Sequence, residues 1–263
     1  HTERAAIYGR MGISVQQFGA ICQWGIQLLN IITGHLDVPG GYTFSLPAVD
    51  MVWGPMNKPG HFNAWQTRVR GLPEFGGELP SSALAEEILT PGEGQIRALV
   101  TGAGNPVLST PNGEQLEGAL EGLDFMVSLD FYINETTRFA DVILPPTSPL
   151  EHDHYDLALS AFAVRNVAKY SQPVFDKPAG ALHDWEILAA LGERVSRLKG
   201  MEPMPAYPPE MVLNMGLQSG PYKDQLNLRM LKDNPHGVDM GPHESQFPER
   251  LVHADKMIRC APA

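Results

Sequence analysis

The residues best suited to hold a ligand lie at the ends of short apolar runs in the centre of the chain. Gly102-Ala103-Gly104-Asn105-Pro106 follows the run at 97–101, and Asp130 ends the run at 125–130, with Asn134 four residues later. Glycines let a backbone approach a ligand closely, and N–H groups at the start of a helix suit phosphate. The Asp130 carboxylate could accept hydrogen bonds from the amino and imino groups of a base. The alternative interpretations are a positive-φ turn at Gly104-Asn105 and a helix cap at Asp130.

The densest group of titratable side chains is Glu151-His152-Asp153-His154. Histidine and carboxylate side chains can bind zinc or iron, and two histidines separated by one residue share a face of a strand. No third ligand stands at a suitable spacing, so we favour a polar loop and assign no metal ligand. The motifs G-x-S-x-G and H-E-x-x-H are absent, and the sequence therefore assigns no catalytic residue.

A second ligand-binding candidate lies near the N-terminus. Tyr8-Gly9-Arg10-Met11-Gly12 stands between a candidate strand ending near Ile7 and a helix. The two glycines allow close backbone approach, and the guanidinium of Arg10 offers a planar fork of donors. The alternative is a strand-to-helix turn that carries a surface arginine.

The elements that must position the central residues alternate between strand and helix. Strands are predicted at 97–101, 125–130 and 141–145, with a helix at 114–120 and a first helical turn at 134–137. Alternation at this spacing is typical of a layered α/β fold with a parallel sheet. Ligands of such sheets bind at the carboxyl ends of the strands, where the glycines and Asp130 lie.

Two longer helices are predicted on either side of this region. The first runs from Ser14 to Thr33, with Ser14 and Gln17 as a capping box and Gly34 as the C-cap. Its apolar stripe consists of Phe18, Ile21, Cys22, Gly25, Leu28, Leu29 and Ile32. The second begins at Asp184 and carries Ile187, Leu188, Leu191, Val195 and Leu198 on one side. Beyond Gly200 we expect a turn-rich tail.

The segment from Asp37 to Pro80 has no helical or strand period. It is far longer than a usual loop of about 4–6 residues, and such segments are commonly functional or cover another part of the molecule. Its aromatic side chains need a partner surface; they are Trp53, Phe62, Trp65 and Phe75.

Composition bounds the class of protein. The 263 residues are 43% hydrophobic, with Lys+Arg 19 against Asp+Glu 30 and a formal net charge of −11. An acidic chain without a basic run is a poor candidate for nucleic-acid binding. No stretch approaches the ~20 apolar residues of a spanning helix, and Cys22 and Cys260 leave both a cytoplasmic and a periplasmic location open. The chain starts without Met, so we expect it to be a piece of a larger protein.

In combination these motifs resemble the molybdopterin oxidoreductases, the dimethyl sulfoxide reductase superfamily that includes formate dehydrogenases and nitrate reductases. Leu29-Asn30 through Thr33-Gly34 to Pro39-Gly40-Gly41 is similar to the family stretch LN-x-x-TG-x-x-x-x-PGG. Gly102 to Pro106 is similar to its G-x-x-NP turn. The run from Asp130 to Pro145 matches D-x-x-x-x-ET-x-x-x-AD-x-x-LP, followed by Glu151 and by Asp184-Trp185.

The resemblance implies a three-layer, Rossmann-like α/β fold, with a mostly parallel sheet, helices on both faces and long irregular loops. It also implies a parent enzyme whose molybdenum or tungsten is held by two molybdopterin guanine dinucleotides. Residues 1–200 would form the region that binds a guanine dinucleotide, and 201–263 a tail leading to a C-terminal β-barrel. By position in the motifs, the resemblance implies cofactor contacts at Arg10, Met11, Gly12, Gly102, Gly104, Asn105, Asp130, Asn134, His152 and Asp184. Arg10 and Met11 would approach the pterin, and Asp130 would bind the guanine edge.

The iron–sulfur cysteines of the family and the segment with the protein ligand to the metal are absent from this sequence. We therefore expect an internal fragment, inactive alone, whose partners are the missing N- and C-terminal domains and an electron-transfer subunit, with an iron–sulfur cluster in the missing N-terminal part. The alternative is a non-catalytic scaffold or electron-transfer subunit of the same fold that has lost the pterin.

Overall fold

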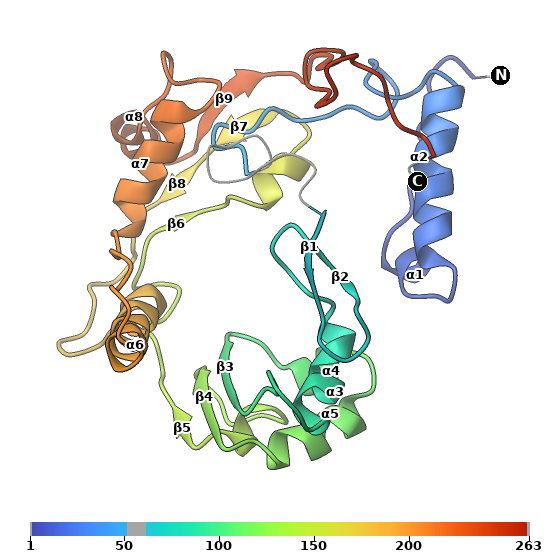
Figure 1. The fold of residues 1–263 in the computed structure, drawn as a ribbon. Coiled ribbons are helices and arrows are strands. Elements are labelled where there is room, and N and C mark those ends of the chain that lie inside the picture. Colours follow the sequence, from blue (N-terminus) through green and yellow to red (C-terminus); the bar gives the residue numbers. More distant parts are fainter. Residues whose placement is uncertain (1, 52–61, 262–263) are drawn as a thin grey trace. The chain divides into compact units, whose positions relative to one another are not determined.

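The computed structural model describes residues 2–51 and 62–261, which fall into two compact units. The first comprises His1–Pro59, Tyr155–Ser171 and Pro209–Ala263, and the second comprises Gly60–His154 and Gln172–Pro208. Figure 1 colours the elements of both along the sequence.

The second unit contains the central sheet and most of the candidate site. Its strands are β1 (Phe62–Gln66), β2 (Pro73–Phe75), β3 (Ala98–Gly102), β4 (Phe125–Leu129) and β5 (Val142–Ile143). Its α-helices are α3 (Leu84–Leu89), α4 (Pro106–Ser109), α5 (Gly113–Glu121) and α6 (Asp184–Leu198). Single 3₁₀ turns occur at η1 (Ser81–Ala83) and η2 (Thr137–Phe139).

The first unit combines residues from both ends of the chain with a short central stretch. Its helices are α1 (Met11–Ser14), α2 (Gly19–Ile32), η3 (Leu159–Phe162), α7 (Pro209–Ser219) and α8 (Leu228–Asp233). Its strands are β7 (Asn166–Ala168), β8 (Tyr170–Ser171) and β9 (Val238–Gly241), and β6 (His154–Tyr155) stands at the boundary between the units.

The predicted parallel sheet is present as three strands in the order β3-β4-β5. Ala98 pairs with Phe125 and Gly102 with Leu129 along β3 and β4, while Val127 pairs with Val142 of β5. Two-stranded sheets form from β1 and β2, from β6 and β8, and from β7 and β9. The chain is therefore a mixed α/β protein with a small parallel sheet and several short sheets. The three-layer Rossmann-like arrangement remains a prediction.

Side chains of β4 alternate between two hydrophobic clusters. Met126 packs with Leu116 and Leu120 of α5, and its neighbour Val127 packs with Ile187 of α6. Successive side chains of a strand point to opposite faces, so helices cover both faces of this strand. The strand predicted at 97–101 is present as β3, but its apolar run does not correspond to a buried strand. β3 has a single neighbouring strand, and Val100 is 53% exposed.

The predicted helix from Ser14 to Thr33 is interrupted. Ser14 ends α1, and α2 begins only at Gly19, so the predicted capping box with Gln17 does not form. The cause is a turn between the helices, in which the Gln16 side-chain oxygen accepts the N–H of Phe18 at 3.0 Å. The end of α2 agrees with the prediction, because Gly34 follows it with a φ of +72° that suits glycine.

The strand predicted to end near Ile7 does not form, and the side chain of Asn30 in α2 holds this segment instead. Its Oδ1 accepts the backbone N–H of Ile7 at 2.9 Å, and its Nδ2 donates to the carbonyl of Ile7 at 2.8 Å. Asn30 is only 1% exposed, so these bonds form away from water. The side-chain amide thus holds the N-terminal segment as a strand partner would. In contrast, Phe18 and Ile32 of the predicted apolar stripe are exposed.

The segment from Asp37 to Pro80, predicted to be irregular, contains the antiparallel pair β1 and β2. Glu74 is completely buried, and its carboxylate accepts the N–H groups of Ala64 and Gly77. The pair escaped prediction because every residue of β1 is exposed, which removes the alternating pattern of a strand. The expectation that its aromatics lack cover is confirmed at the three described positions, which are Phe62 (61% exposed), Trp65 (48%) and Phe75 (72%). Trp53 lies outside the described residues.

The tail after residue 200, predicted to be turn-rich, forms α7, α8 and β9 and supplies much of the core of the first unit. Leu217 of α7 and Leu231 of α8 are buried with Ala168 of β7, against which β9 pairs. The two ends of the chain also meet. Oδ2 of the buried Asp37 accepts the N–H groups of Gln246 and Phe247, each at 2.6 Å.

The stability of this core should depend on pH through Glu210. The Lys232 ammonium (2.6 Å) and then the Tyr170 hydroxyl (2.5 Å) hydrogen-bond its carboxylate and lower the pKa of Glu210. A lowered pKa in the folded state means that the stabilisation is present above the ordinary pKa of glutamate and is lost as the pH falls. Thermal unfolding followed from pH 7 to pH 3 should therefore show a smaller fall in Tm for Glu210→Gln than for the unmodified chain.

The control for this pH series is Glu249→Gln, since Glu249 is an exposed carboxylate of the same unit with no ion pair among the described residues. It should follow the unmodified chain at every pH. Parallel curves for Glu210→Gln and the unmodified chain would show that this ion pair contributes nothing to the pH dependence.

Candidate functional site: the carboxyl ends of the parallel strands

The loop after β3 is open at both of its glycines. A Cβ added at Gly102 would meet nothing within 4 Å, and at Gly104 only the Gly102 carbonyl at 3.7 Å. The positive φ of this turn belongs to Ala103 (+51°), whose N–H donates to the Leu129 carbonyl at 2.9 Å. The alternative interpretation, a positive-φ turn at Gly104-Asn105, is therefore wrong, because the positive φ lies one residue earlier, at Ala103. The glycines leave open space beside the backbone.

The backbone of this loop also offers donors. Within residues 62–261, the N–H groups of Gly104 and Asn105 donate to no other group of the protein. The helix that follows, α4, is a single turn of 4 residues. Its dipole is correspondingly small, so the individual N–H groups are what the loop can present to an anion.

Asn105 joins the loop after β3 to the loop after β4. Its Nδ2 donates to Oε2 of Glu135 at 2.7 Å, and its Oδ1 accepts the hydroxyl of Thr136 at 2.7 Å. The Thr136 oxygen in turn accepts the backbone N–H of Val107 at 3.1 Å. Thr136 is completely buried. Both ends of the Asn105 amide are thus fixed, and the two loops form one hydrogen-bonded unit.

Asp130 lies at the end of β4, as predicted, and is already partly occupied. Its Oδ1 accepts the N–H groups of Phe131 (2.6 Å) and Tyr132 (3.1 Å), and its Oδ2 accepts Nδ2 of Asn134 at 3.2 Å. A carboxylate has about four acceptor positions. Asp130 therefore holds its own loop and does not cap a helix, because the next helical turn begins only at Thr137. It keeps about one position for a ligand in this conformation.

Asn134 supports this loop from its other end. Its Oδ1 accepts the N–H groups of Thr136 (3.0 Å) and Thr137 (2.9 Å), at the start of the 3₁₀ turn η2. The predicted first helical turn at 134–137 is thus present as a capped 3₁₀ turn. The amide oxygen of Asn134 thus accepts two backbone N–H groups, while its Nδ2 donates to the Asp130 carboxylate.

Glu135, in the loop after β4, places a negative charge beside Asn105 in the loop after β3. The hydrogen bond from Asn105 is the largest effect that lowers the pKa of Glu135, and the nearby Arg138 adds to it. The side chain is exposed. The carboxylate is therefore ionised at neutral pH and accessible to a ligand.

His152 and Asp184 lie in a second group at the start of α6. The His152 ring stands edge to face with the His183 ring, with centroids 6.1 Å apart, and the buried Thr147 hydroxyl shares a hydrogen bond of 2.6 Å with Nδ1 of His183. Asp184 is exposed, and its Oδ1 accepts the N–H of Trp185 at 2.8 Å. The structure brings these residues together at one helix end.

Glu186 completes the start of α6. Its carboxylate accepts the Lys177 ammonium at 2.7 Å and the N–H of His183 at 2.8 Å, and these bonds, that of Lys177 first, lower the pKa of Glu186. The predicted helix start at Asp184 is confirmed. The apolar side of α6 is buried at Ile187, while Leu188, Val195 and Leu198 are exposed.

Arg10, Met11 and Gly12 belong to the first unit. Arg10 and Met11 are exposed, and a Cβ at Gly12 would meet nothing within 4 Å. The Arg10 carbonyl accepts the N–H groups of Ile13 and Ser14 and so begins α1. A common site for these residues and those of the second unit remains a prediction.

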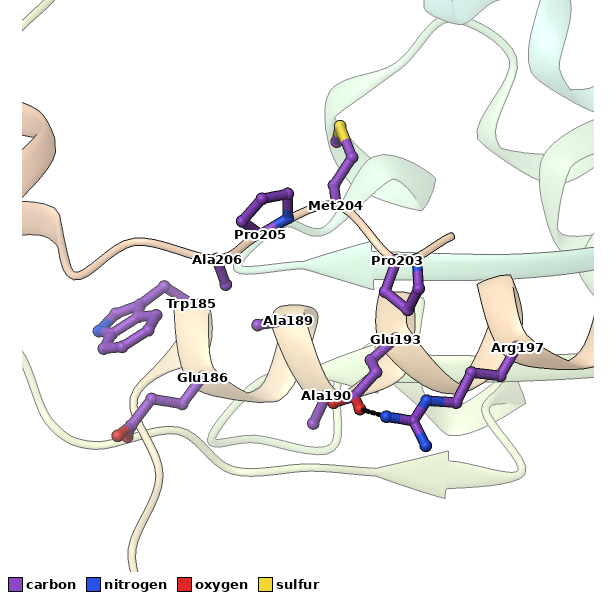
Figure 2. A pocket seen from close by; sticks show the side chains of 10 residues that line it. All are labelled: Trp185, Glu186, Ala189, Ala190, Glu193, Arg197, Pro203, Met204, Pro205 and Ala206. Carbon is purple, nitrogen blue, oxygen red and sulfur yellow. Dashed lines mark hydrogen bonds and ion pairs between the residues drawn. The ribbon is translucent and has the colours of Figure 1, made fainter. Parts of the chain in front are cut away.

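An open groove of about 580 Å³ runs along α6. Figure 2 shows its second wall, the segment Pro203–Ala206, with Trp185 near one end and Arg197 near the other. Arg197 donates to Glu193 at 2.5 Å. None of the predicted cofactor residues lines this groove, although Trp185 and Glu186, which do, directly follow Asp184.

Residues 2–51 and 62–261 contain no group of three or more His, Cys, Asp or Glu side chains placed to hold a metal ion. No helix among them is long and apolar enough to cross a membrane.

The sequence interpretation gave no role to Glu135, Thr136, Thr147 or His183. The first two stand in the E-T-T run noted for its likeness to a family motif, and that run was the available signal. Their partners Asn105 and Val107 are about 30 residues away, so their contacts follow only from the pairing of β3 with β4.

Comparison with known proteins places this region in a family. Residues 2–194 match the molybdopterin oxidoreductase family. The chain is 27% identical to the alpha subunit of formate dehydrogenase 1 from Methanococcus maripaludis, over 64% of this chain and 26% of the relative. It is 34% identical to the assimilatory nitrate reductase catalytic subunit of Bacillus subtilis, over 40% of this chain and 14% of the relative.

A third relative is the alpha subunit of formate dehydrogenase from Methanocaldococcus jannaschii, 28% identical over 74% of this chain and 30% of the relative. The chain thus spans less than a third of the length of the curated relatives it matches. The family match extends over most of the chain and includes the loops after β3 and β4 as well as the start of α6. The chain belongs to the molybdopterin oxidoreductase family.

Proposed function

We propose that this chain is the part of a molybdenum or tungsten oxidoreductase that holds the guanine dinucleotide end of its pterin cofactor, and that it is inactive alone. The observation that carries the proposal is the pairing of β3 with β4. It brings the open Gly102–Asn105 loop beside Asp130 within the matched region. Formate dehydrogenase and nitrate reductase relatives support the reaction class.

The residues present are chemically suited to such a group. The N–H group of Gly104 can donate to a phosphate and that of Asn105 to a phosphate or a sugar oxygen, and the open space at the glycines lets the nucleotide approach. Asp130 has an acceptor position left for the amino or imino group of guanine. When bound, the cofactor supplies the two-electron redox chemistry. These residues bind and orient its dinucleotide.

The remaining assignments follow from the family. Arg10, Met11 and Gly12 would approach the pterin, and His152 with Asp184 would add polar contacts. Residues 1–200 would form the three-layer Rossmann-like binding region, and 201–263 would lead to a β-barrel. An iron–sulfur cluster, the protein ligand to the metal and the surface for an electron-transfer subunit would belong to other parts of the parent protein.

The test compares the chain with its parent. The parent should contain about one metal and two pterins per chain, as the family resemblance implies. The 263-residue chain should carry no molybdenum or tungsten and bind guanosine diphosphate only weakly, which ligand-observed NMR detects. Elemental analysis measures the metal content, and pterin fluorescence measures the pterin content.

Two results would contradict the proposal. A parent without pterin would favour the non-catalytic scaffold that has kept the fold. Stoichiometric metal in the isolated chain would show that the reacting centre lies within these residues.

A further inference from the structure

We infer that Glu135 binds the sugar of the nucleotide by accepting hydrogen bonds from its ribose hydroxyls, with Asn105 as its positioning residue. The inference rests on the proposed function and assigns a role to a residue outside the predicted cofactor set. It also assigns the ribose, and not a phosphate, as the part of the nucleotide that lies beside Asn105.

The first argument is the fixed position of the carboxylate. The Thr136 hydroxyl donates to Oδ1 of Asn105 at 2.7 Å, which leaves Nδ2 of the same amide to donate to Glu135, also at 2.7 Å. Thr136 is buried and is itself held by the N–H of Val107. The amide therefore cannot rotate without breaking both of its hydrogen bonds, and it holds the Glu135 carboxylate beside the two loops.

The second argument is charge. Glu135 is exposed and ionised, and its pKa is lowered mainly by Asn105. A phosphate beside Asn105 would stand next to this carboxylate, and two negative charges at such a separation repel. At Gly104 a Cβ would meet only the Gly102 carbonyl, at 3.7 Å, so a phosphate has open space to approach the backbone there. The phosphates thus belong near Gly104, and a neutral group belongs near Asn105.

The third argument is hydrogen-bond chemistry. An ionised carboxylate only accepts hydrogen bonds, and Asn105 fills only part of its acceptor capacity. The two adjacent hydroxyls of a ribose are neutral donors, and hydrogen bonds to a charged acceptor are stronger than those between neutral groups. Ribose hydroxyls therefore match the carboxylate in both charge and donor character.

The experiment compares two probes, guanosine 5′-diphosphate and its 2′,3′-dideoxy analogue, by ligand-observed NMR titration of the 263-residue chain. The chain should bind the ribose form about tenfold more tightly, the scale of a hydrogen bond to a charged group. In Glu135→Ala this preference should fall to about one, with no weakening for the dideoxy form. Glu135→Gln, which keeps an acceptor for Asn105, should retain an intermediate preference.

The matched control is Glu121→Ala, which removes an exposed carboxylate of the same unit that forms no ion pair among the described residues. It should keep the full preference. Equal weakening of both probes in Glu135→Ala would mean that Glu135 only stabilises the loop, and would overturn the inference. Equal affinity of the unmodified chain for the two probes would also overturn it, while the proposed function would stand. Binding of neither probe would contradict the proposed function itself.

Discussion

Replacing Asp130 with alanine should lower the molybdenum and pterin content of the parent protein to a small fraction of its normal value. In the 263-residue chain, it should weaken guanosine diphosphate binding at least about tenfold, the scale of one lost charge-assisted hydrogen bond. The reason is the position of the carboxylate, which ends β4 and keeps an acceptor position beyond its three loop contacts. Pterin fluorescence and NMR titration measure the two effects.

Asp130→Asn separates binding from loop support. Asparagine keeps an oxygen for the N–H groups of Phe131 and Tyr132 but loses the charge and both acceptor positions of the second oxygen. It should therefore bind nucleotide poorly, with a fall in Tm limited to the lost Asn134 contact. Asp124→Ala is the matched control, since Asp124 is an exposed carboxylate paired with Arg97 in the same unit. Full cofactor content in Asp130→Ala would remove Asp130 from the site.

The second large effect is expected at Thr136. Thr136→Val keeps the shape of the side chain but removes the hydroxyl that donates to Asn105 and accepts from Val107. A buried N–H left without a partner costs about 1–3 kcal/mol, so the free energy of unfolding should fall by about 2 kcal/mol. Guanosine diphosphate binding should weaken as well, because the two loops are no longer joined. Urea unfolding and NMR titration measure these quantities.

Thr90→Val is the matched control, because the Thr90 hydroxyl makes no hydrogen bond with any described residue. It should leave both stability and binding close to those of the unmodified chain. An unchanged free energy of unfolding in Thr136→Val would show that water replaces the hydroxyl, and that the joined loops are not a requirement of the fold.

The elements that the sequence predicted well are those whose pattern is local. The apolar run at 125–130 predicts β4 correctly, because β4 is the central strand of its sheet. Gly34 and Gly122 mark the ends of α2 and α5. The prediction failed where burial depends on distant residues. β3 has the same apolar character as β4 but one neighbouring strand, and β1 is exposed throughout. The helices after residue 200 are stabilised by Ala168 and Tyr170, which no local pattern reveals.

In the candidate site, too, the sequence identified residues that belong to a local motif but not the roles that depend on distant contacts. Asp130 and Asn105 were identified because they stand at strand ends within a family motif. Glu135 and Thr136 stand in the same motif, but their roles come from hydrogen bonds to the neighbouring strand's loop. Such bonds depend on the register of β3 and β4, which pairs Gly102 with Leu129 and sets the two loops side by side.

The discontinuous first unit has a consequence for synthesis on the ribosome. Asp37 finds its partners Gln246 and Phe247 about 210 residues later, and β7 finds β9 some 70 residues later. A nascent chain cannot close these contacts until residues 238–247 have emerged, whereas β3, β4 and β5 lie within about 45 consecutive residues. Contacts so distant in sequence carry a larger loop-closure entropy and form slowly. We therefore expect the sheet and the loops after β3 and β4 to fold first, and the contacts of Asp37 and β7 to form only after residues 238–247 have been synthesised.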